Sequence, residues 1–176
     1  MVVTRTVGAY KDPALPAPLE VPEGEAWLSR LTALEPGCAL TLEAAARTLC
    51  PHDAVPDRCY RRVVLQLDRG AAANPDLAGL LAQGAAQLDG LQPLAFAELS
   101  EGGRVAALRQ VEGGPFFRAI QRGTVRHLYD DREVWALFGY EGSAHQLGGY
   151  RERGFADLAW LADPPKAICE GEGDLT

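Results

Sequence analysis

The histidines are the residues of this 176-residue chain best suited to hold a metal ion. His52, His127 and His145 lie far apart, and none belongs to an H-x-x-x-H or H-E-x-x-H pattern that would place two ligands on one helix face. The spacing therefore predicts no metal ligands.

His52 is followed directly by Asp53, and an adjacent His-Asp pair at a helix end occurs in some metal-dependent phosphohydrolases. Partner ligands at matching spacing are missing. The favoured interpretation is a loop between two prolines, in which Asp53 caps the backbone and His52 packs on a neighbour. A metal-dependent hydrolase that uses His52, Asp53 and some combination of His127, His145 and acidic residues remains an alternative hypothesis.

Two other groups could suggest catalysis. Ser143 lies two residues before His145 in the stretch EGSAH, but the G-x-S-x-G elbow is absent, and a turn serine is the favoured interpretation. The run 130–133, with sequence DDRE, falls where a helix is expected to start, so we predict a cap and a solvated first turn on the surface. No catalytic residue is predicted in this chain.

The glycine-rich stretch 139–154 could suggest a phosphate-binding loop. It does not follow an expected β-strand and lacks G-x-G-x-x-G, and no P-loop occurs, so no cofactor is predicted to bind this chain. The cysteines, at 38, 50, 59 and 169, have no C-x-x-C spacing and are interpreted as free, half-buried thiols. Whether Cys50 and Cys59 form a disulfide stays open.

The aromatic residues fall into two groups. The first is predicted to pack in the core and comprises Phe116, Phe117, Tyr129, Trp135 and Phe138. The second lies on loops shaped by glycine, where rigid aromatics can anchor a protein interface or belong to the core. The candidate partner interface consists of Tyr140, Gly142, Gly149, Tyr150, Phe155 and Trp160.

These residues must be positioned by helices. Apolar residues at three- and four-residue spacing predict an all-α single domain of about six to seven helices. The predicted helices cover 24–34, 41–50, 57–72, 74–90, a shorter stretch after Ser100, 115–131 and 131–138. Pro115 starts the helix at 115–131, and Gly139 is the C-cap of the helix at 131–138.

Two of these helices are predicted to be amphipathic. In 57–72 the charged residues Arg58, Arg61, Arg62 and Asp68 are placed largely away from the apolar side. In 115–131 the core-facing side is predicted to include Val125, Leu128 and Tyr129, although Gly123 weakens the helix.

The ends of the chain differ from its middle. Residues 1–23 are predicted to form an extended N-terminal arm, because 12–24 hold four prolines. The helical domain is expected over 24–163, with a Gly/aromatic loop region towards its end, and 164–176 is an acidic, glycine-rich tail.

Charge and hydropathy exclude some classes of partner. The net charge of −7 and pI near 5.0 argue against nucleic acid, which needs clustered Lys and Arg. No stretch approaches the roughly 20 continuous apolar residues that span a bilayer, so no membrane insertion is expected. No export signal is visible at the N-terminus, so a cytoplasmic location is expected.

Four segments together resemble one family. They are TLCPHDAVPDRCYRRVV at 48–64, GPFFRAI at 114–120, LYDDREVWALFGYEG at 128–142 and GGYRERGFADLAWL at 148–161. Over residues 24–163 the chain resembles the gluconate 2-dehydrogenase subunit 3 family, the small subunits that accompany flavin dehydrogenases of the glucose-methanol-choline class. The last two segments are the most specific.

The resemblance implies a helical, non-catalytic protein that binds a large FAD-dependent dehydrogenase subunit and stabilises or matures it. FAD and the oxidation of a sugar, sugar acid or other alcohol would belong to that partner. Members of the family often carry a twin-arginine leader, which is not seen here, so a periplasmic location would require export together with the partner. A free-standing interaction domain for another protein is the other hypothesis.

Overall fold

The computed structural model describes residues 18–140, 142, 143, 145 and 149. Over these residues the chain is entirely helical, with no strands, which confirms the predicted all-α class. The elements are the 3-10 helices η1 (Ala26–Arg30) and η2 (Phe96–Glu98) and the α-helices α1 (Pro36–Leu49), α2 (Asp57–Ala73), α3 (Pro75–Asp89), α4 (Glu101–Gln110), α5 (Pro115–Tyr129) and α6 (Arg132–Phe138).

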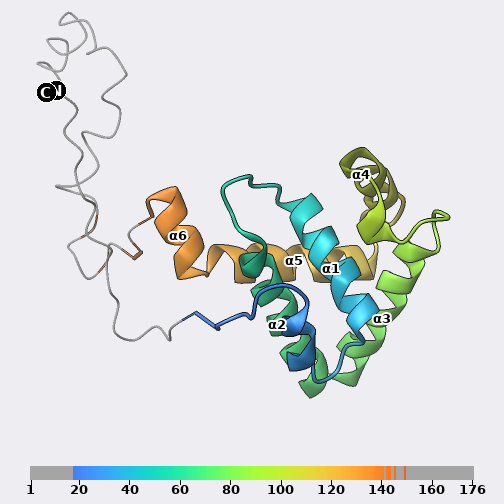
Figure 1. Cartoon of the computed structure of the whole chain (residues 1–176), viewed down its shortest axis with the longest axis horizontal. Coiled ribbons are helices and arrows are strands. Elements are labelled where there is room, and N and C mark those ends of the chain that lie inside the picture. Colours follow the sequence, from blue (N-terminus) through green and yellow to red (C-terminus); the bar gives the residue numbers. More distant parts are fainter. Residues whose placement is uncertain (1–17, 141, 144, 146–148, 150–176) are drawn as a thin grey trace, which may run out of the picture. The chain divides into compact units, whose positions relative to one another are not determined.

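Four helices make the centre of the fold. The helices α1, α2, α3 and α5 all pack against one another, and in Figure 1 the long α5 crosses behind α1 and α2. Helix α4 and η2 lie against α1, whereas α6 packs against the end of α5. Among the described residues no helix has both the length and the apolar character needed to cross a membrane.

The core between these helices is built from the apolar stripes of the sequence. Its largest fully buried side chains include Trp27, Tyr60, Phe96, Leu42, Leu81, Leu88, Ile120 and Leu128. Burying an aliphatic or aromatic side chain of this kind stabilises the fold by about 1.5–3 kcal/mol each. Packing of the amphipathic faces therefore dominates the stability of the helices.

Several predicted helix ends are confirmed by their hydrogen bonds. The side chain of Asn74 accepts from the N–H groups of Asp76 and Leu77 at the start of α3, and Ser100 accepts from Gly103 N–H at the start of α4. Gly139 ends α6 with a left-handed φ of 71°, a conformation that favours glycine.

The predicted helix over 24–34 is wrong in extent. Only the 3-10 helix η1 forms, and Leu31 is extended with ψ 143°. The cause is the buried carboxylate of Asp68 in α2, which accepts from the N–H groups of Thr32, Ala33 and Leu34 and from the Thr32 hydroxyl at 2.7–2.9 Å. These donors cannot bond to helix carbonyls at the same time, so the chain turns here.

The predicted start of the helix at 41–50 is also wrong, because α1 begins five residues earlier at Pro36. Proline is well tolerated at the first helical position, where its missing N–H costs no hydrogen bond. The prediction that this helix stops at Cys50 is confirmed.

Helix α5 buries a narrower stripe than predicted. The buried residues recur every four positions at Phe116, Ile120, Thr124 and Leu128. Val125 and Tyr129, predicted to face the core, each lie one position further along and are 48% and 41% exposed. The apolar pattern of the sequence was therefore wider than the contact that the other helices make.

The chain divides into two compact units, 1–141 and 142–176. The account of the fold and of the surfaces below concerns the first unit, which holds all eight helices of the described residues. Most of the predicted N-terminal arm and all of the acidic tail lie outside the described residues.

Candidate partner-binding surface

An ion-pair cluster fixes α6 to α2. Arg62 on α2 reaches Asp131 and Glu133 with N···O distances of 2.5 Å each, and Arg58 also pairs with Glu133. The side chains of Arg62 and Asp131 are only 9% and 5% exposed. The predicted solvated surface at 130–133 is thus wrong for Asp131. The prediction that Arg62 and Asp68 point away from the apolar side is also wrong, because both are buried.

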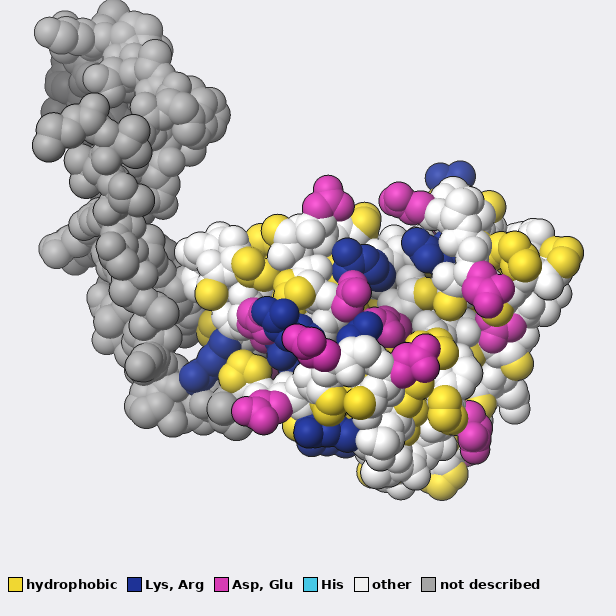
Figure 2. Space-filling model, viewed as in Figure 1, with side chains coloured by type: hydrophobic (Ala, Val, Ile, Leu, Met, Phe, Trp, Pro, Cys, Tyr) yellow, Lys and Arg dark blue, Asp and Glu magenta, His cyan; other side chains and the backbone are white. Residues whose placement is uncertain are grey.

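The charges in this cluster support one another. Burial opposes ionisation of Glu133, but hydrogen bonds from Arg58 and Arg62 outweigh it and lower the pKa of its carboxyl group. Burial likewise works against the charge of Arg62, yet its contacts with Glu133 and Asp131 raise its pKa overall. Glu133 and Arg62 are therefore both charged at neutral pH. Figure 2 shows arginine and acidic side chains intermixed on one face of the described chain.

Asp131 has a second role as the cap of α6. Its Oδ1 accepts from the backbone N–H of Glu133 at 2.9 Å, as predicted for a cap. Helix α6 is thus held at its N-terminus by Asp131, through Arg62 by α2, and at its C-terminus by Gly139. These contacts at both ends fix the orientation of α6 and of the side chains on its surface.

Aromatic side chains gather on the outside of this junction. His52 Nε2 lies 2.6 Å from the Tyr129 hydroxyl, and the His52 ring meets Tyr129 and Phe138 edge-on at centroid distances of 5.7 and 5.0 Å. Tyr140 packs edge-on against Trp135 at 5.1 Å. We call Tyr129, Phe138 and Tyr140, together with His52, the aromatic patch.

The patch is exposed although it is well anchored. Tyr129, Phe138 and Tyr140 are 41%, 47% and 48% exposed, and Leu137 beside them is 45% exposed. The predicted core cluster therefore divides: Phe116 is buried and Phe117 half-buried, whereas Tyr129 and Phe138 face outwards. This group of exposed apolar side chains is therefore a candidate interaction site.

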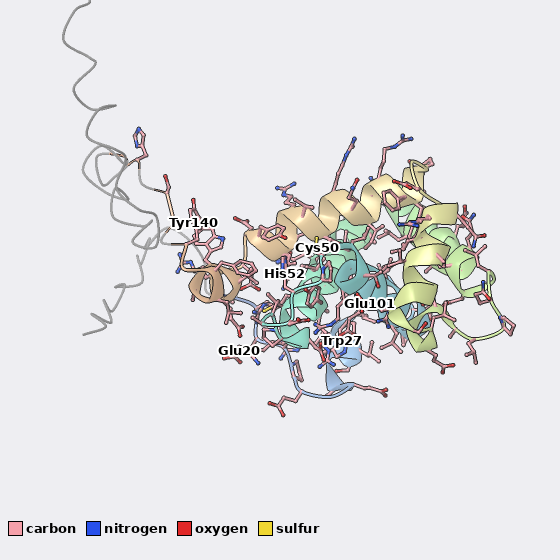
Figure 3. All side chains as sticks on the ribbon, turned by 90° about the horizontal axis from the view of Figure 1, so that it is seen from above. Glu20, Trp27, Cys50, His52, Glu101 and Tyr140 are labelled. Atoms are coloured by element: carbon pink, nitrogen blue, oxygen red, sulfur yellow. The ribbon has the colours of Figure 1, made fainter. Side chains whose placement is uncertain are left out.

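A layer of hydrogen bonds lies beneath the patch. The Tyr60 hydroxyl donates to the Cys50 carbonyl at 2.6 Å and lies 3.3 Å from the His52 N–H, which donates to it. Burial raises the pKa of the Cys50 thiol, against a hydrogen bond with Tyr129. In Figure 3, Cys50 and His52 lie next to each other in the part of the molecule near α6. His52 is therefore packed, as predicted, whereas the predicted capping role of Asp53 is wrong, because Asp53 is exposed and its side chain makes no hydrogen bond within the described residues.

The metal-site hypothesis requires several ligand side chains placed close together. Within the described ranges no group of three His, Cys, Asp or Glu side chains is placed to hold a metal ion. The ring of His52 is engaged by Tyr129 and Phe138, and His127 is a half-buried residue of α5 whose pKa is lowered by burial. Cys38, Cys50 and Cys59 are free thiols, and Cys169 lies outside the described residues.

The candidate interface residues are only partly covered by the structure. Tyr140 is exposed, and Gly142 and Gly149 have positive φ angles of 94° and 78°, consistent with the predicted tight turns. Ser143 accepts from the His145 backbone N–H at 3.4 Å, a local turn contact. Tyr150, Phe155 and Trp160 lie outside the described residues, so their predicted role stays a prediction.

Sequence reasoning missed Arg62 and the exposed part of α5. The signal for Arg62 is its position three residues after Cys59 and next to Val63, within the buried row of α2, where an arginine requires carboxylates.

No family profile, curated protein sequence or solved structure gives a significant match to this chain.

Proposed function

We propose that this protein is a non-catalytic small subunit that binds a large FAD-dependent sugar or alcohol dehydrogenase and stabilises or matures it. The proposal rests on the resemblance of four segments to the gluconate 2-dehydrogenase subunit 3 family. FAD and the oxidation of substrate belong to the partner in this proposal, and this chain contributes a binding surface.

The observation that supports it best is the aromatic patch. Its residues Tyr129, Phe138 and Tyr140 belong to the segment LYDDREVWALFGYEG, one of the two most specific of the resemblance. The same segment supplies Asp131 and Glu133, which tie α6 to α2. An exposed apolar group on a fixed support loses little conformational entropy on binding, which favours a protein interface.

The same patch also fits a free-standing interaction domain for another protein, which is the second candidate function. The two differ only in the partner. Identification of the bound protein, and of its cofactor, therefore discriminates between them.

The test is to co-express this chain with a large flavin dehydrogenase of the glucose-methanol-choline class from the same organism, to purify through a tag on this chain, and to record the flavin absorption of the eluate. A double variant, Phe138→Ala with Tyr140→Ala, removes two exposed members of the patch. Leu94→Ala is the matched control, because Leu94 is 55% exposed but lies in the loop before η2.

A yellow eluate that oxidises a sugar or alcohol is the expected result, with recovery of flavin reduced about tenfold or more in the double variant and unchanged in the control. Helix content by circular dichroism should be the same in all three proteins. A colourless eluate, with the flavoprotein present and soluble in the same cells, would contradict the proposal.

A further inference from the structure

The outward face of α5 carries a regular row of arginines. Beyond its first residue, Pro115, the exposed positions of this helix are Arg118, Gln121, Arg122, Val125, Arg126 and Tyr129. At 100° per residue these six positions share an arc of about 140°, opposite the buried stripe. Figure 3 shows nitrogen-tipped side chains standing out from α5 on the side away from the other helices.

These arginines differ from three of the four arginines of α2, whereas the fourth, Arg69, is likewise exposed and makes no ion pair in the described part of the chain. Arg58, Arg61 and Arg62 all pair with carboxylates of α1 or of the segment at α6. Within the described part of the chain, the side chains of Arg118, Arg122 and Arg126 make no hydrogen bond and no ion pair. A chain with a net charge of −7 thus presents three uncompensated cations on one helix face.

Apolar groups lie between these cations. Val125, 48% exposed, stands next to Arg122 and Tyr129 on the helix surface, and Tyr129 joins the row to the aromatic patch. Successive arginines are four residues apart, so they rise by about 6 Å each along the axis. The row from Arg118 to Tyr129 is about 16 Å long.

We infer that the outward face of α5 is a docking surface for a row of carboxylates, spaced about 6 Å apart and flanked by apolar side chains, on the surface of the partner protein. The inference rests on the proposed function and names the surface and the chemistry of its partner. The guanidinium group binds carboxylates through two parallel hydrogen bonds, which makes arginine the better residue for such contacts.

The charge balance favours a protein over a phosphate-bearing partner. Anionic lipid surfaces are recognised by clusters of four to eight Lys or Arg, and nucleic acid by extended basic surfaces. Three arginines on a chain of net charge −7 fall short of both. They suffice to orient and discriminate a protein surface of opposite charge.

The experiment measures the Kd of this chain for the purified flavoprotein at 50 and 500 mM NaCl. The variants are Arg122→Gln, Arg122→Glu and the triple Arg118→Glu, Arg122→Glu, Arg126→Glu. Arg109→Glu is the matched control, because Arg109 is exposed on α4 and also pairs with no carboxylate in the described residues. Vesicles of phosphatidylcholine with phosphatidylserine, and a random DNA duplex, are titrated in parallel.

We expect Arg122→Glu to raise the Kd about tenfold, Arg122→Gln about threefold and the control not at all. The Kd of the wild type should rise with salt, and that of the triple variant should not. If the Kd of the complex is the same in the wild type and in all the arginine variants, this inference is overturned but the proposed function still stands. Arginine-dependent binding to vesicles or DNA, with flavoprotein binding unaffected, also overturns it, and absence of any complex overturns both.

Discussion

Two neighbouring arginines of α2 provide a matched test of how α6 is held. Arg62 is buried between Asp131 and Glu133, with its side chain 9% exposed, whereas Arg61 pairs with Glu43 of α1 at 3.0 Å and is 19% exposed. Substitution of each by methionine keeps an unbranched side chain and removes one positive charge. The two variants therefore differ mainly in what they leave behind.

Loss of Arg62 leaves the carboxylate of Asp131 buried without its cation. Removing one partner of a buried ion pair costs about 3–5 kcal/mol, and we expect about 3 kcal/mol because Arg58 still pairs with Glu133. Arg61→Met should cost about 1 kcal/mol, because the Glu43 side chain is still 16% exposed and Arg47 remains near it as a second cation. Burial already raises the pKa of Glu43 despite its contact with Arg61, so this pair does not fully offset its own desolvation.

Urea unfolding followed by circular dichroism measures both effects. With a slope of about 1.5 kcal/mol per molar urea, Arg62→Met should lower the midpoint by roughly 2 M and Arg61→Met by roughly 0.7 M. Adding Asp131→Asn to Arg62→Met should restore part of the loss, because asparagine can still cap α6 and carries no charge.

Hydrogen exchange supplies a second readout. The amides of α6 should exchange faster in Arg62→Met, whereas those of α3 should change only as much as the global stability does. Equal midpoint shifts for Arg61→Met and Arg62→Met would refute the reasoning, since burial of the cluster would then add nothing. A double variant less stable than Arg62→Met alone would do the same.

Two further predictions concern the core. Asp68→Asn should destabilise the fold by about 3 kcal/mol, because an amide cannot accept the four hydrogen bonds that the carboxylate receives. Burial alone would raise the pKa of Asp68, but these bonds lower it, so its contribution is complete above the unfolded-state pKa near 4 and is lost as pH falls through the lower folded value. Acid titration of the unfolding midpoint should accordingly be steeper for the wild type than for the variant, and parallel curves would contradict this. In α3, Gly84→Ala should lower the thermal midpoint by the equivalent of about 2 kcal/mol, because its Cβ would come within 2.0 Å of the buried Phe116 ring. In the same helix, a Cβ added at Gly79 meets nothing within 4 Å, so Gly79→Ala should stabilise the fold by about 0.5–1 kcal/mol and raise the thermal midpoint. A lower thermal midpoint in both variants would refute the packing argument.

The helices themselves could be predicted from local signals. Asn74, Ser100, Pro115 and Gly139 mark helix ends through their own backbone or side-chain chemistry, and the structure confirms each of them. The segment at 24–34 could not be predicted in this way, since its turn depends on Asp68, which lies more than 30 residues further along the chain. Propensity and spacing carry no information on such a contact.

The surface was harder to predict than the core for the same reason. Apolar spacing in α5 and α6 indicates helices, but it does not tell which of the apolar positions meets another helix. Tyr129, Phe138 and Val125 look like core residues in the sequence and are exposed in the structure. Arg62 shows the opposite error, because its carboxylates come from a segment about 70 residues away.

The orientation of the aromatic patch depends on the ion-pair cluster. Helix α6 has only seven residues, and isolated helices shorter than about 12 residues are marginal in water. Its order must come from contacts, and Arg62 and Arg58 supply them at its first turn while His52 contacts Phe138 at its last. A fixed orientation of the patch therefore depends on the buried ion pair between Arg62 of α2 and Asp131. An apolar residue at position 62 would be buried at a lower cost in free energy than an arginine. The buried arginine is explained if the ion-pair cluster positions α6 for the proposed interface.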